Sequence, residues 1–524
     1  MRRVVDRDSV DSHAVMSVSS GWGARRRIRR VLAVDPFDPF FLVIMGIAAG
    51  LRFWRLGAQS FWYDEFVTVQ VASRRFGDLF DAIGHHEGSP PLYFLLSWGW
   101  LRIFGDSDVA LRTLSTVAGV LTIPIAYLIA RELGQPRRTR RVAALLVATN
   151  PLLIWYSQEA RPYSLLVFLA AASLLWCARA ANRGRWQDLL LWGLWSALAL
   201  STHYFALFFV AVEAAWILGA QRQQWRRLAM TCSLVGAVGL ATVPLALQQR
   251  STGQQKWIAA WPLAVRLKEA GRAALLGPGA PSEALWLPAA ALVAIAPLIL
   301  LVKGQRSERH PATVLTAVAG AAIALPLIVS LGRDHFLGRN VIASVVPLLV
   351  ATGIGLGARR AGWLGATAIA GLVVLSTAIV FAVETNPDLQ KPNWRSVAEV
   401  LKRGTDNRVV VVNNHAVLGR PLLRYLPSSR ELNGVDAVQV REIDLLIHKP
   451  ITVRCDWFVG RDCGLIFLGG QLHKGLTSSF TLAGQNAVGN FTVARYRSRG
   501  VVTLRRSQIA TNEFGESLVL VLPS

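Results

Sequence analysis

The adjacent carboxylates of Asp64 and Glu65 are the first candidates for chemistry in this sequence, because the aromatic run from Phe61 to Tyr63 precedes them. A carboxylate at an apolar surface can take the proton of an acceptor hydroxyl and so act as a general base. The alternative for such a pair is a solvated loop or the first turn of a helix, where acids stabilise the N-terminus. The aromatic flank favours a catalytic pair.

A second cluster, His85-His86-Glu87, lies shortly before Pro90 and Pro91. Imidazoles and carboxylates can bind a divalent metal. Three consecutive residues surround one ion poorly, so we expect His86 and Glu87 to orient a polar substrate. The alternative is a loop that leads into a helix started by proline.

The third cluster spans residues 155–163 and carries Tyr156, Gln158, Glu159, Arg161 and Tyr163. An arginine can bind a phosphate through two parallel hydrogen bonds. The alternative is an arginine that reaches past an apolar segment to lipid head groups. A charge at membrane depth is a functional hypothesis by default, so Arg161 is a candidate phosphate ligand.

Two shorter clusters complete the set of candidates. His203 and Tyr204 lie in a turn between two apolar segments, and Arg333, His335 and Arg339 lie in a polar stretch before another. The second group offers two cations and an imidazole to an anion. His203 by itself is better explained as a packed residue at the membrane interface.

The composition places these clusters in a membrane protein. Of 524 residues, 53% are apolar and 17% are charged, whereas an average soluble protein has about 25% charged residues. This excludes an ordinary soluble domain and a disordered chain. The net charge of +24 would suit nucleic acid, but the arginines lie between apolar runs, as topology signals do. We therefore expect no nucleic-acid partner.

Eleven apolar segments of about 15–22 residues have the length at which a helix crosses a bilayer. Basic loops alternate with them, such as the one over 131–141, and this puts the N-terminus and every second loop in the cytoplasm. We expect a cytoplasmic basic tail over 1–36, retained with a signal anchor, and a multi-pass protein of the plasma membrane. The expected segments are 38–56, 109–130, 142–156, 162–180, 187–201, 204–220, 228–247, 285–302, 311–331, 340–357 and 363–383.

All five clusters fall on the outer side of this topology. The first outer loop runs from about 57 to 108, and we expect its apolar stretch 90–104 to form an amphipathic helix on the outer surface. Acids, cations and aromatic rings on one face predict a site for a membrane-borne donor that carries a phosphate, since water-soluble nucleotide donors are made inside the cell.

The last part of the chain, 385–524, has a different character. Its charge rises and short β-rich runs appear, for example at 408–413 and 518–522, after a helix-like stretch at 394–403. This predicts a small extracytoplasmic α/β domain. Cys455 and Cys463 lie in it, either as a disulfide, which an oxidising compartment allows, or as two free thiols.

Several of these motifs resemble the multi-pass GT-C glycosyltransferases, and most of all the bacterial protein O-mannosyltransferases and aminoarabinose transferases. The resemblance is strong over about 38–220 and weaker to 384. The segment 334–347 is similar to an arginine-containing segment of that family, although Gly-Arg-Asn stands here where Arg-Tyr is commoner, and Trp394-Arg395-Ser396-Val397 is similar to the start of the tail in many actinobacterial members. The motifs that carry the main resemblance are Tyr63-Asp64-Glu65, Pro90-Pro91-Leu92-Tyr93, Leu101-Arg102-Ile103-Phe104-Gly105, Ala110-Leu111-Arg112 and Ser157-Gln158-Glu159-Ala160-Arg161-Pro162-Tyr163.

The resemblance implies a GT-C transmembrane catalytic domain over 37–384 and, as donor, a mannose- or arabinose-like sugar on a polyprenyl phosphate. Asp64 would take the acceptor proton, and Glu65 would support it. Arg161, with Arg333 or Arg339, would hold the phosphate, and direct displacement would invert the anomeric centre.

The resemblance leaves the use of a divalent metal open. Some relatives bind a metal through a glutamate near the position of Glu87 together with a distant histidine, for which His86, His203 or His335 could serve. The family also has metal-free members.

The sequence leaves the acceptor open as a protein, a glycan or a lipid. A transporter or flippase for glycolipids is one alternative function, and it would have interrupted helices with charges near the bilayer midplane, whereas the charges here collect at one face. A non-catalytic envelope assembly protein that binds through its outer domain is the other alternative.

Overall fold

The computed structural model describes residues 38–253, 258–259, 261–332, 335–403, 408–413, 419–432, 437–448, 478–509, 511–512, 515–516 and 518–522. The expected tail over 1–36, the candidate Arg333 and the pair Cys455 and Cys463 lie outside these described residues.

Seven described helical stretches are long and apolar enough to cross a membrane, and each coincides with an expected segment. They contain α6 (Asp108–Glu132), α9 (Tyr163–Arg183), α12 (Trp225–Ala241) with α13 (Val243–Ser251), α15 (Trp286–Lys303), α16 (Arg306–Ser330), η5 (Gly338–Ser344) with α17 (Val345–Leu356), and α18 (Gly362–Thr385). The other four expected segments form shorter helices, namely α2 (Pro39–Phe53), α7 (Arg137–Thr149) with α8 (Pro151–Ser157), α10 (Trp186–Leu200) and α11 (Ala206–Ala220). The protein is a helical membrane protein, and the total of eleven spans stays a prediction.

The expected segment 142–156 is broken into α7 and α8 at a proline. Pro151 has no backbone N–H to continue the hydrogen bonds of α7. The side chain of Asn150 caps the new helix by accepting the backbone N–H of Leu153 at 3.0 Å. The short α8 ends at Ser157, and the turn that follows it, 158–162, carries three of the candidate site residues.

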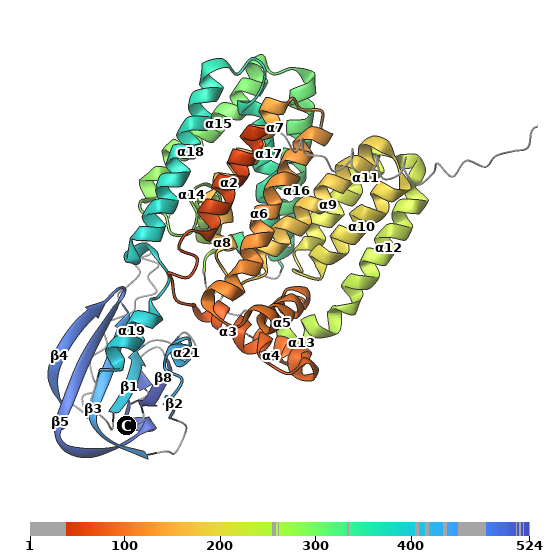
Figure 1. Ribbon diagram of the computed structural model, residues 1–524. Helices are drawn as coiled ribbons and strands as arrows, with labels where there is room; N and C mark the ends of the chain where they lie inside the picture. Colours follow the sequence, from red (N-terminus) through yellow and green to blue (C-terminus); the bar gives the residue numbers. More distant parts are fainter. Residues whose placement is uncertain are drawn as a thin grey trace, which may run out of the picture. The chain divides into compact units, whose positions relative to one another are not determined.

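The segment expected to be the first outer loop contains α3 (Tyr63–Ala72), α4 (Leu79–His86) and α5 (Leu92–Phe104). These three helices and α13 lie together at one end of the long helices (Figure 1). The helix expected over 90–104 is present as α5. A further helix, α14 (Leu263–Leu276), lies between α13 and α15. The hydrophobicity pattern missed α14 because its sequence carries several charged residues.

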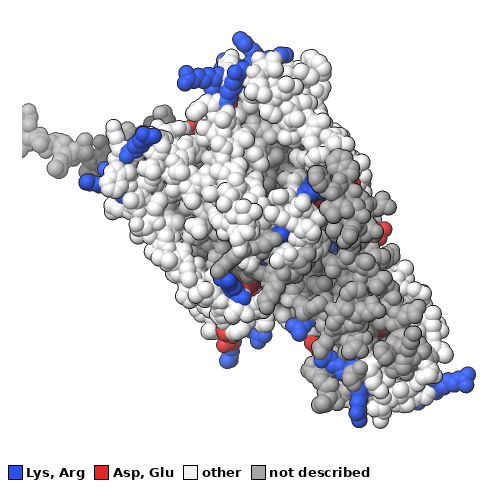
Figure 2. Space-filling model, turned by 180° about the vertical axis from the view of Figure 1, so that it is seen from behind, with Lys and Arg blue, Asp and Glu red and all other residues white. Residues whose placement is uncertain are grey.

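The surface of the helical part has the charge distribution of a protein in a lipid bilayer. On the face that Figure 2 shows, lysine and arginine side chains gather near the upper end, and few charged residues interrupt the broad surface below. Such a surface can contact acyl chains without burying unpaired charges.

The C-terminal part forms a six-stranded sheet with the order β2-β8-β1-β3-β5-β4. Strands β1 and β3 are parallel, and the other pairs are antiparallel. The strands are β1 (Arg408–Asn413), β2 (Arg430–Glu431), β3 (Ala437–His448), β4 (Thr481–Val488), β5 (Phe491–Arg505) and β8 (Leu518–Leu522), and the helices α19 (Trp394–Leu401) and α21 (Leu422–Tyr425) accompany them. Apolar residues of α19, α21 and the sheet form one core, which includes Trp394, Leu422 and Phe491. The expected α/β domain is therefore present.

Candidate active site

Asp64 lies in the first turn of α3, where the helix dipole favours a negative charge. One of its oxygens, Oδ2, is 3.2 Å from Nη1 of Arg339 in η5. The side chain of Asp64 is 19% exposed and that of Arg339 is 25% exposed. This carboxylate is therefore accessible from outside the protein and faces a cation that is also accessible.

Glu65 has the opposite environment, because its side chain is fully buried. Its two oxygens accept hydrogen bonds from Nε and Nη2 of Arg112 at 2.7 and 2.8 Å, and the backbone N–H of Ala160 donates to Oε1 at 2.9 Å. Burial alone would raise the pKa of Glu65, but the charges of Arg112 and Lys391 and these hydrogen bonds lower it to about 2. Glu65 is an ionised carboxylate whose oxygens are occupied within the protein.

Arg112 holds the chain that follows α2 in place. In addition to Glu65, its guanidinium donates to the backbone carbonyls of Leu56, Gln59 and Ser60 at 2.8–3.2 Å. It is 2% exposed. An arginine inside an expected membrane segment was the signal in the sequence that could have identified this residue.

Arg161 forms a buried, bidentate ion pair with Glu87. Its Nη1 and Nη2 donate to the two carboxylate oxygens at 2.7 and 3.0 Å, and Nη1 also donates to the backbone carbonyl of Asp64 at 3.0 Å and to Thr68. Burial lowers the pKa of Arg161, but the charges of Glu87 and Asp64 and the hydrogen bonds to Glu87 together outweigh it, so the pKa lies well above the usual value. The Nε of Arg161 is buried and has no hydrogen-bond partner among the described residues.

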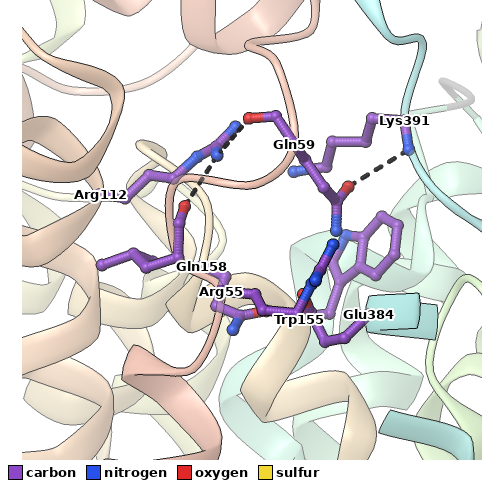
Figure 3. Close-up of a pocket in the computed structure, with 8 residues that line it drawn as sticks. Arg55, Gln59, Arg112, Trp155, Gln158, Glu384 and Lys391 are labelled. Carbon is purple, nitrogen blue, oxygen red and sulfur yellow. Dashed lines mark hydrogen bonds between the residues drawn. The ribbon is translucent and has the colours of Figure 1, made fainter. Parts of the chain in front are cut away.

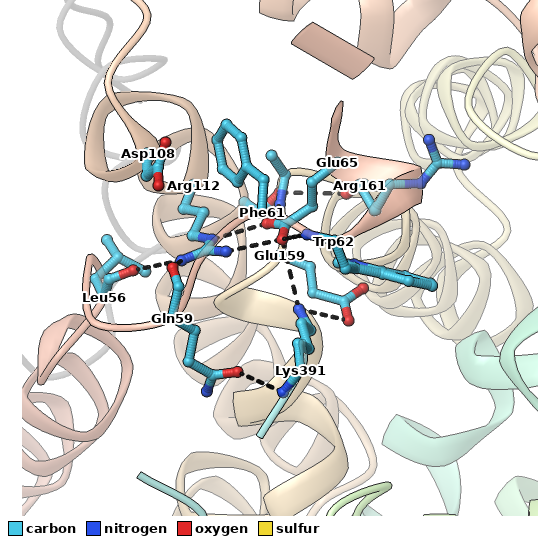
Figure 4. Close-up of polar contacts among 12 residues, drawn as sticks. Leu56, Gln59, Phe61, Trp62, Glu65, Asp108, Arg112, Glu159, Arg161 and Lys391 are labelled. Carbon is cyan, nitrogen blue, oxygen red and sulfur yellow. Dashed lines mark hydrogen bonds and ion pairs between the residues drawn. The ribbon is translucent and has the colours of Figure 1, made fainter. Parts of the chain in front are cut away.

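Glu159 pairs with a lysine that the sequence did not single out. Nζ of Lys391 is 2.9 Å from Oε1 of Glu159, and the indole N–H of Trp155 donates to the same oxygen at 2.7 Å. Arg112 and Lys391 approach Glu65 from different sides (Figure 4). The described part of the chain thus brings four acids together with four cations, in the pairs Asp64–Arg339, Glu65–Arg112, Glu87–Arg161 and Glu159–Lys391.

Aromatic side chains border this group of charges. The rings of Tyr156 and Tyr163 have their centroids 4.9 Å apart, and His203 lies 5.9 Å from Tyr163. The guanidinium of Arg339 lies 5.7 Å from the centroid of Tyr163. Burial, together with the charges of Arg339 and Arg161, lowers the pKa of His203 to about 3, so this imidazole is neutral at physiological pH. Such a border suits the ring of a sugar or the chain of a lipid.

The remaining candidates make other contacts. Gln158 donates to backbone carbonyls at the end of α2, the hydroxyl of Tyr204 donates to Gln249 in α13 at 2.9 Å, and His86 is exposed at the end of α4. Nδ1 of His335 is buried without a hydrogen-bond partner among the described residues.

The described residues do not fit the metal site that the resemblance leaves open. Both oxygens of Glu87 accept hydrogen bonds from Arg161, and no group of three His, Cys, Asp or Glu side chains within the described ranges is arranged to hold an ion.

A small pocket opens beside the Glu65–Arg112 pair. Figure 3 shows the polar ends of its side chains around the opening, with Lys391 and Arg112 near Gln59 and with Glu384 near Trp155. The complete lining is Arg55, Leu56, Gln59, Arg112, Trp155, Gln158, Glu384 and Lys391.

Comparison with known proteins connects this geometry to a set of relatives. Residues 88–247 match the model of a family described as dolichyl-phosphate-mannose-protein mannosyltransferase. The chain is 30% identical over 170 residues to the undecaprenyl phosphate-alpha-4-amino-4-deoxy-L-arabinose arabinosyl transferase of Pseudomonas aeruginosa strain UCBPP-PA14, a match that covers 32% of this chain and 31% of the relative. The chain therefore spans about a third of the length of the curated relatives that it matches.

Two solved structures share the fold over nearly the whole chain. The crystal structure of ArnT from Cupriavidus metallidurans bound to undecaprenyl phosphate superposes with a TM-score of 0.52 at 12% identity, over 88% of this chain and 98% of that one. The same protein in the apo state gives a TM-score of 0.51 at 12% identity, over 90% and 98% of the two chains.

Proposed function

We propose that this chain, which has the GT-C fold of membrane glycosyltransferases, transfers a sugar from a polyprenyl-phosphate donor to an extracytoplasmic acceptor, with inversion at the anomeric carbon. The sugar is mannose- or arabinose-like. The observation that carries the proposal is the position of Asp64, a partly exposed carboxylate at a helix N-terminus, next to the guanidinium groups of Arg339 and Arg161. A base beside phosphate-binding cations is the arrangement that this reaction requires.

Asp64 acts as the base in the proposed reaction. It accepts the proton of the acceptor hydroxyl while that oxygen attacks the anomeric carbon. The bond between the anomeric carbon and the phosphate oxygen breaks at the same time, and the bonding electrons leave with the polyprenyl phosphate. Because the attack comes from the side opposite the leaving phosphate, the anomeric configuration inverts.

Arg339 and Arg161 stabilise the negative charge that develops on the departing phosphate. Arg339 is the more exposed of the two, at 25% of its side chain, so it is the cation that meets the phosphate first. Arg161 stays fixed by Glu87 and contributes its charge from behind the backbone of Asp64. Glu65 holds Arg112 and, through it, the loop that precedes Asp64.

The proposed topology places this reaction on the extracytoplasmic side of the plasma membrane. The tail over 1–36 and the basic loop over 131–141 face the cytoplasm, the transmembrane catalytic domain covers 37–384, and the domain over 385–524 lies outside. The grouping of α3, α4 and α5 at one end of the long helices supports this arrangement (Figure 1).

The proposal is tested by replacing the base in a cell that lacks the chromosomal copy. Mass spectrometry of envelope glycans, glycoproteins and lipids from the deletion strain identifies the missing sugar and its acceptor together. The wild-type chain restores that product, and D64N lowers its formation by about 10²–10⁴-fold, the usual contribution of a general base. The control is D81N, because Asp81 is an exposed acid of the same loop and pairs with His85.

Equal amounts of each variant in the membrane fraction are required for the comparison. An envelope without any missing sugar, or a D64N strain that restores the product as well as D81N does, contradicts the proposal. A binding or assembly protein would tolerate D64N, so the same experiment separates these functions.

A further inference from the structure

We propose that Lys391 is a positioning residue of the active site, which neutralises the buried acids behind Asp64 and holds the first outer loop from the side of the C-terminal domain. Its effect on sugar transfer rests on the proposed function. Its effect on the loop does not.

The contacts of Lys391 place a cation between two buried carboxylates. Its Nζ is 2.9 Å from Oε1 of Glu159 and 3.7 Å from Oε2 of Glu65. The Lys391 side chain is 9% exposed, that of Glu159 is 2% exposed and that of Glu65 is fully buried. The indole rings of Trp155 and Trp62 lie 5.1 and 5.7 Å from the ammonium group. Because water has little access to these side chains, their charges are weakly screened and interact strongly.

The charge balance of the cluster needs this lysine. Burial raises the pKa of Glu159, and the nearby charge of Glu65 raises it further, whereas the charge of Lys391 lowers it. Arg112 compensates only one of these two charges, because Nε and Nη2 of its guanidinium bind Glu65 and Nη1 donates to backbone carbonyls. Lys391 is the second cation. Without it, one carboxylate charge would be buried without compensation, directly behind the proposed base.

Lys391 also belongs to a segment that is attached to the loop leading to Asp64. Its backbone N–H donates to Oε1 of Gln59 at 3.3 Å. Two residues further on, Oδ1 of Asn393 accepts a hydrogen bond from the hydroxyl of Ser60 at 3.1 Å. The backbone N–H of Arg395 donates to the same hydroxyl at 3.1 Å.

The attachment continues into the sheet domain. Nη1 of Arg395 donates to the carbonyl of Gly57 at 3.0 Å, and the backbone N–H of Phe61 donates to the hydroxyl of Tyr425 in α21 at 2.8 Å. The loop over 57–61 is therefore fixed by Arg112 on one side and by the C-terminal part on the other. Since Asp64 follows this loop by three residues, its position depends on both attachments.

Lys391 is separated from the proposed base by more than three hundred residues of sequence, and it enters the cluster after the last long helix, α18. The C-terminal domain is therefore part of the catalytic unit in this chain, because the segment that begins it completes the charges of the site.

The test compares K391M, K391R and the double variant K391M/E159Q with the full-length wild type in lipid nanodiscs. The matched control is K402M, because Lys402 belongs to the same C-terminal part but is half exposed and pairs with the exposed Glu399. Hydrogen exchange of the amides over 56–65, followed by mass spectrometry, measures the loop directly. We expect K391M to raise exchange there about tenfold or more, as local opening does, and K402M to leave it unchanged.

K391R keeps the charge and should preserve the protection of the loop amides against exchange. K391M/E159Q removes both charges of the pair and should restore most of this protection. In the transfer assay, K391M should lower kcat about tenfold or more while the KM for the donor changes less than about threefold, because it disturbs the base and not the binding of the lipid. If K391M fails to fold, folding of K391M/E159Q supports the charge balance, and failure of that variant as well contradicts it.

Unchanged exchange over 56–65 in K391M, or a change confined to the sheet domain, overturns the proposal. Loss of protection in K391M together with a wild type that transfers no sugar overturns the proposed function and leaves the positioning role supported. The two failures are therefore distinguishable.

Discussion

The buried pair between Glu65 and Arg112 should be the largest single electrostatic contribution to the stability of the end of the helical bundle that carries α3, α4 and α5. R112M removes the cation and keeps a side chain of comparable length. Glu65 then remains buried, and among the described residues the cation left to pair with it is Lys391, at 3.7 Å, which Glu159 already engages.

The magnitude follows from the burial of both partners, which are 2% exposed and fully buried. Removing one partner of a buried ion pair costs about 3–5 kcal/mol, because an uncompensated charge stays in a medium of low polarity. The carbonyls of Leu56, Gln59 and Ser60 lose their donor in the same variant, and each such lost hydrogen bond adds about 1 kcal/mol.

Thermal unfolding of the purified protein in nanodiscs, followed by tryptophan fluorescence, measures this effect. The matched control is R102M, because Arg102 in α5 also donates to backbone carbonyls but is exposed and has no carboxylate partner among the described residues. R112M should unfold at a clearly lower temperature than R102M, and R112M/E65Q should recover part of the loss. Equal unfolding temperatures for R112M and R102M would contradict the claim that the buried Glu65–Arg112 pair stabilises the protein.

Three further predictions follow from the same structure. The pKa of Glu65 falls from 4.5 to about 2 on folding. The ionised Glu65 therefore stabilises the folded state by an amount on the order of 3 kcal/mol, which is complete above pH 4.5 and is lost as the pH falls to 2. The unfolding temperature of the wild type should drop more over this pH window than that of E65Q. Asp108 accepts hydrogen bonds from Arg395 and Tyr425, so D108N should speed tryptic cleavage within residues 386–395, whereas D106N at an exposed acid should not. A cysteine placed at residue 137 should resist a membrane-impermeant reagent applied to intact cells, and rapid labelling would reverse the proposed topology.

The hydrophobic pattern of the sequence predicted the long helices because a span must be apolar over its whole length. It did not predict the break at Pro151, where the apolar residues continue through the proline and only the missing N–H ends α7. It missed α14 for the opposite reason. The charged residues Arg266, Lys268, Glu269 and Arg272 interrupt the apolar pattern of this helix, which packs against α8, η5 and α15.

The convergence of Asp64, Arg161 and Arg339 could be expected from residue type and from the predicted topology, which puts all three on the same side of the membrane. The ion-pair partners of the site residues could not be predicted. Which acid pairs with which cation depends on side-chain directions after packing, and Lys391 lies far from Glu159 in sequence, with no spacing that indicates contact. Arg112 carried a recognisable signal, a charge within an apolar segment, but nothing in the sequence indicated that its partner is Glu65.

The most direct test of the account is a cryo-EM structure of the full chain in a nanodisc with undecaprenyl phosphate. We expect the phosphate to lie within hydrogen-bond distance of Arg339, on the accessible side of Asp64, with the lipid chain passing the rings of Tyr156 and Tyr163. A phosphate bound at the other end of the helical bundle, or at a site that Asp64 does not reach, would contradict the proposal that these residues form one donor site.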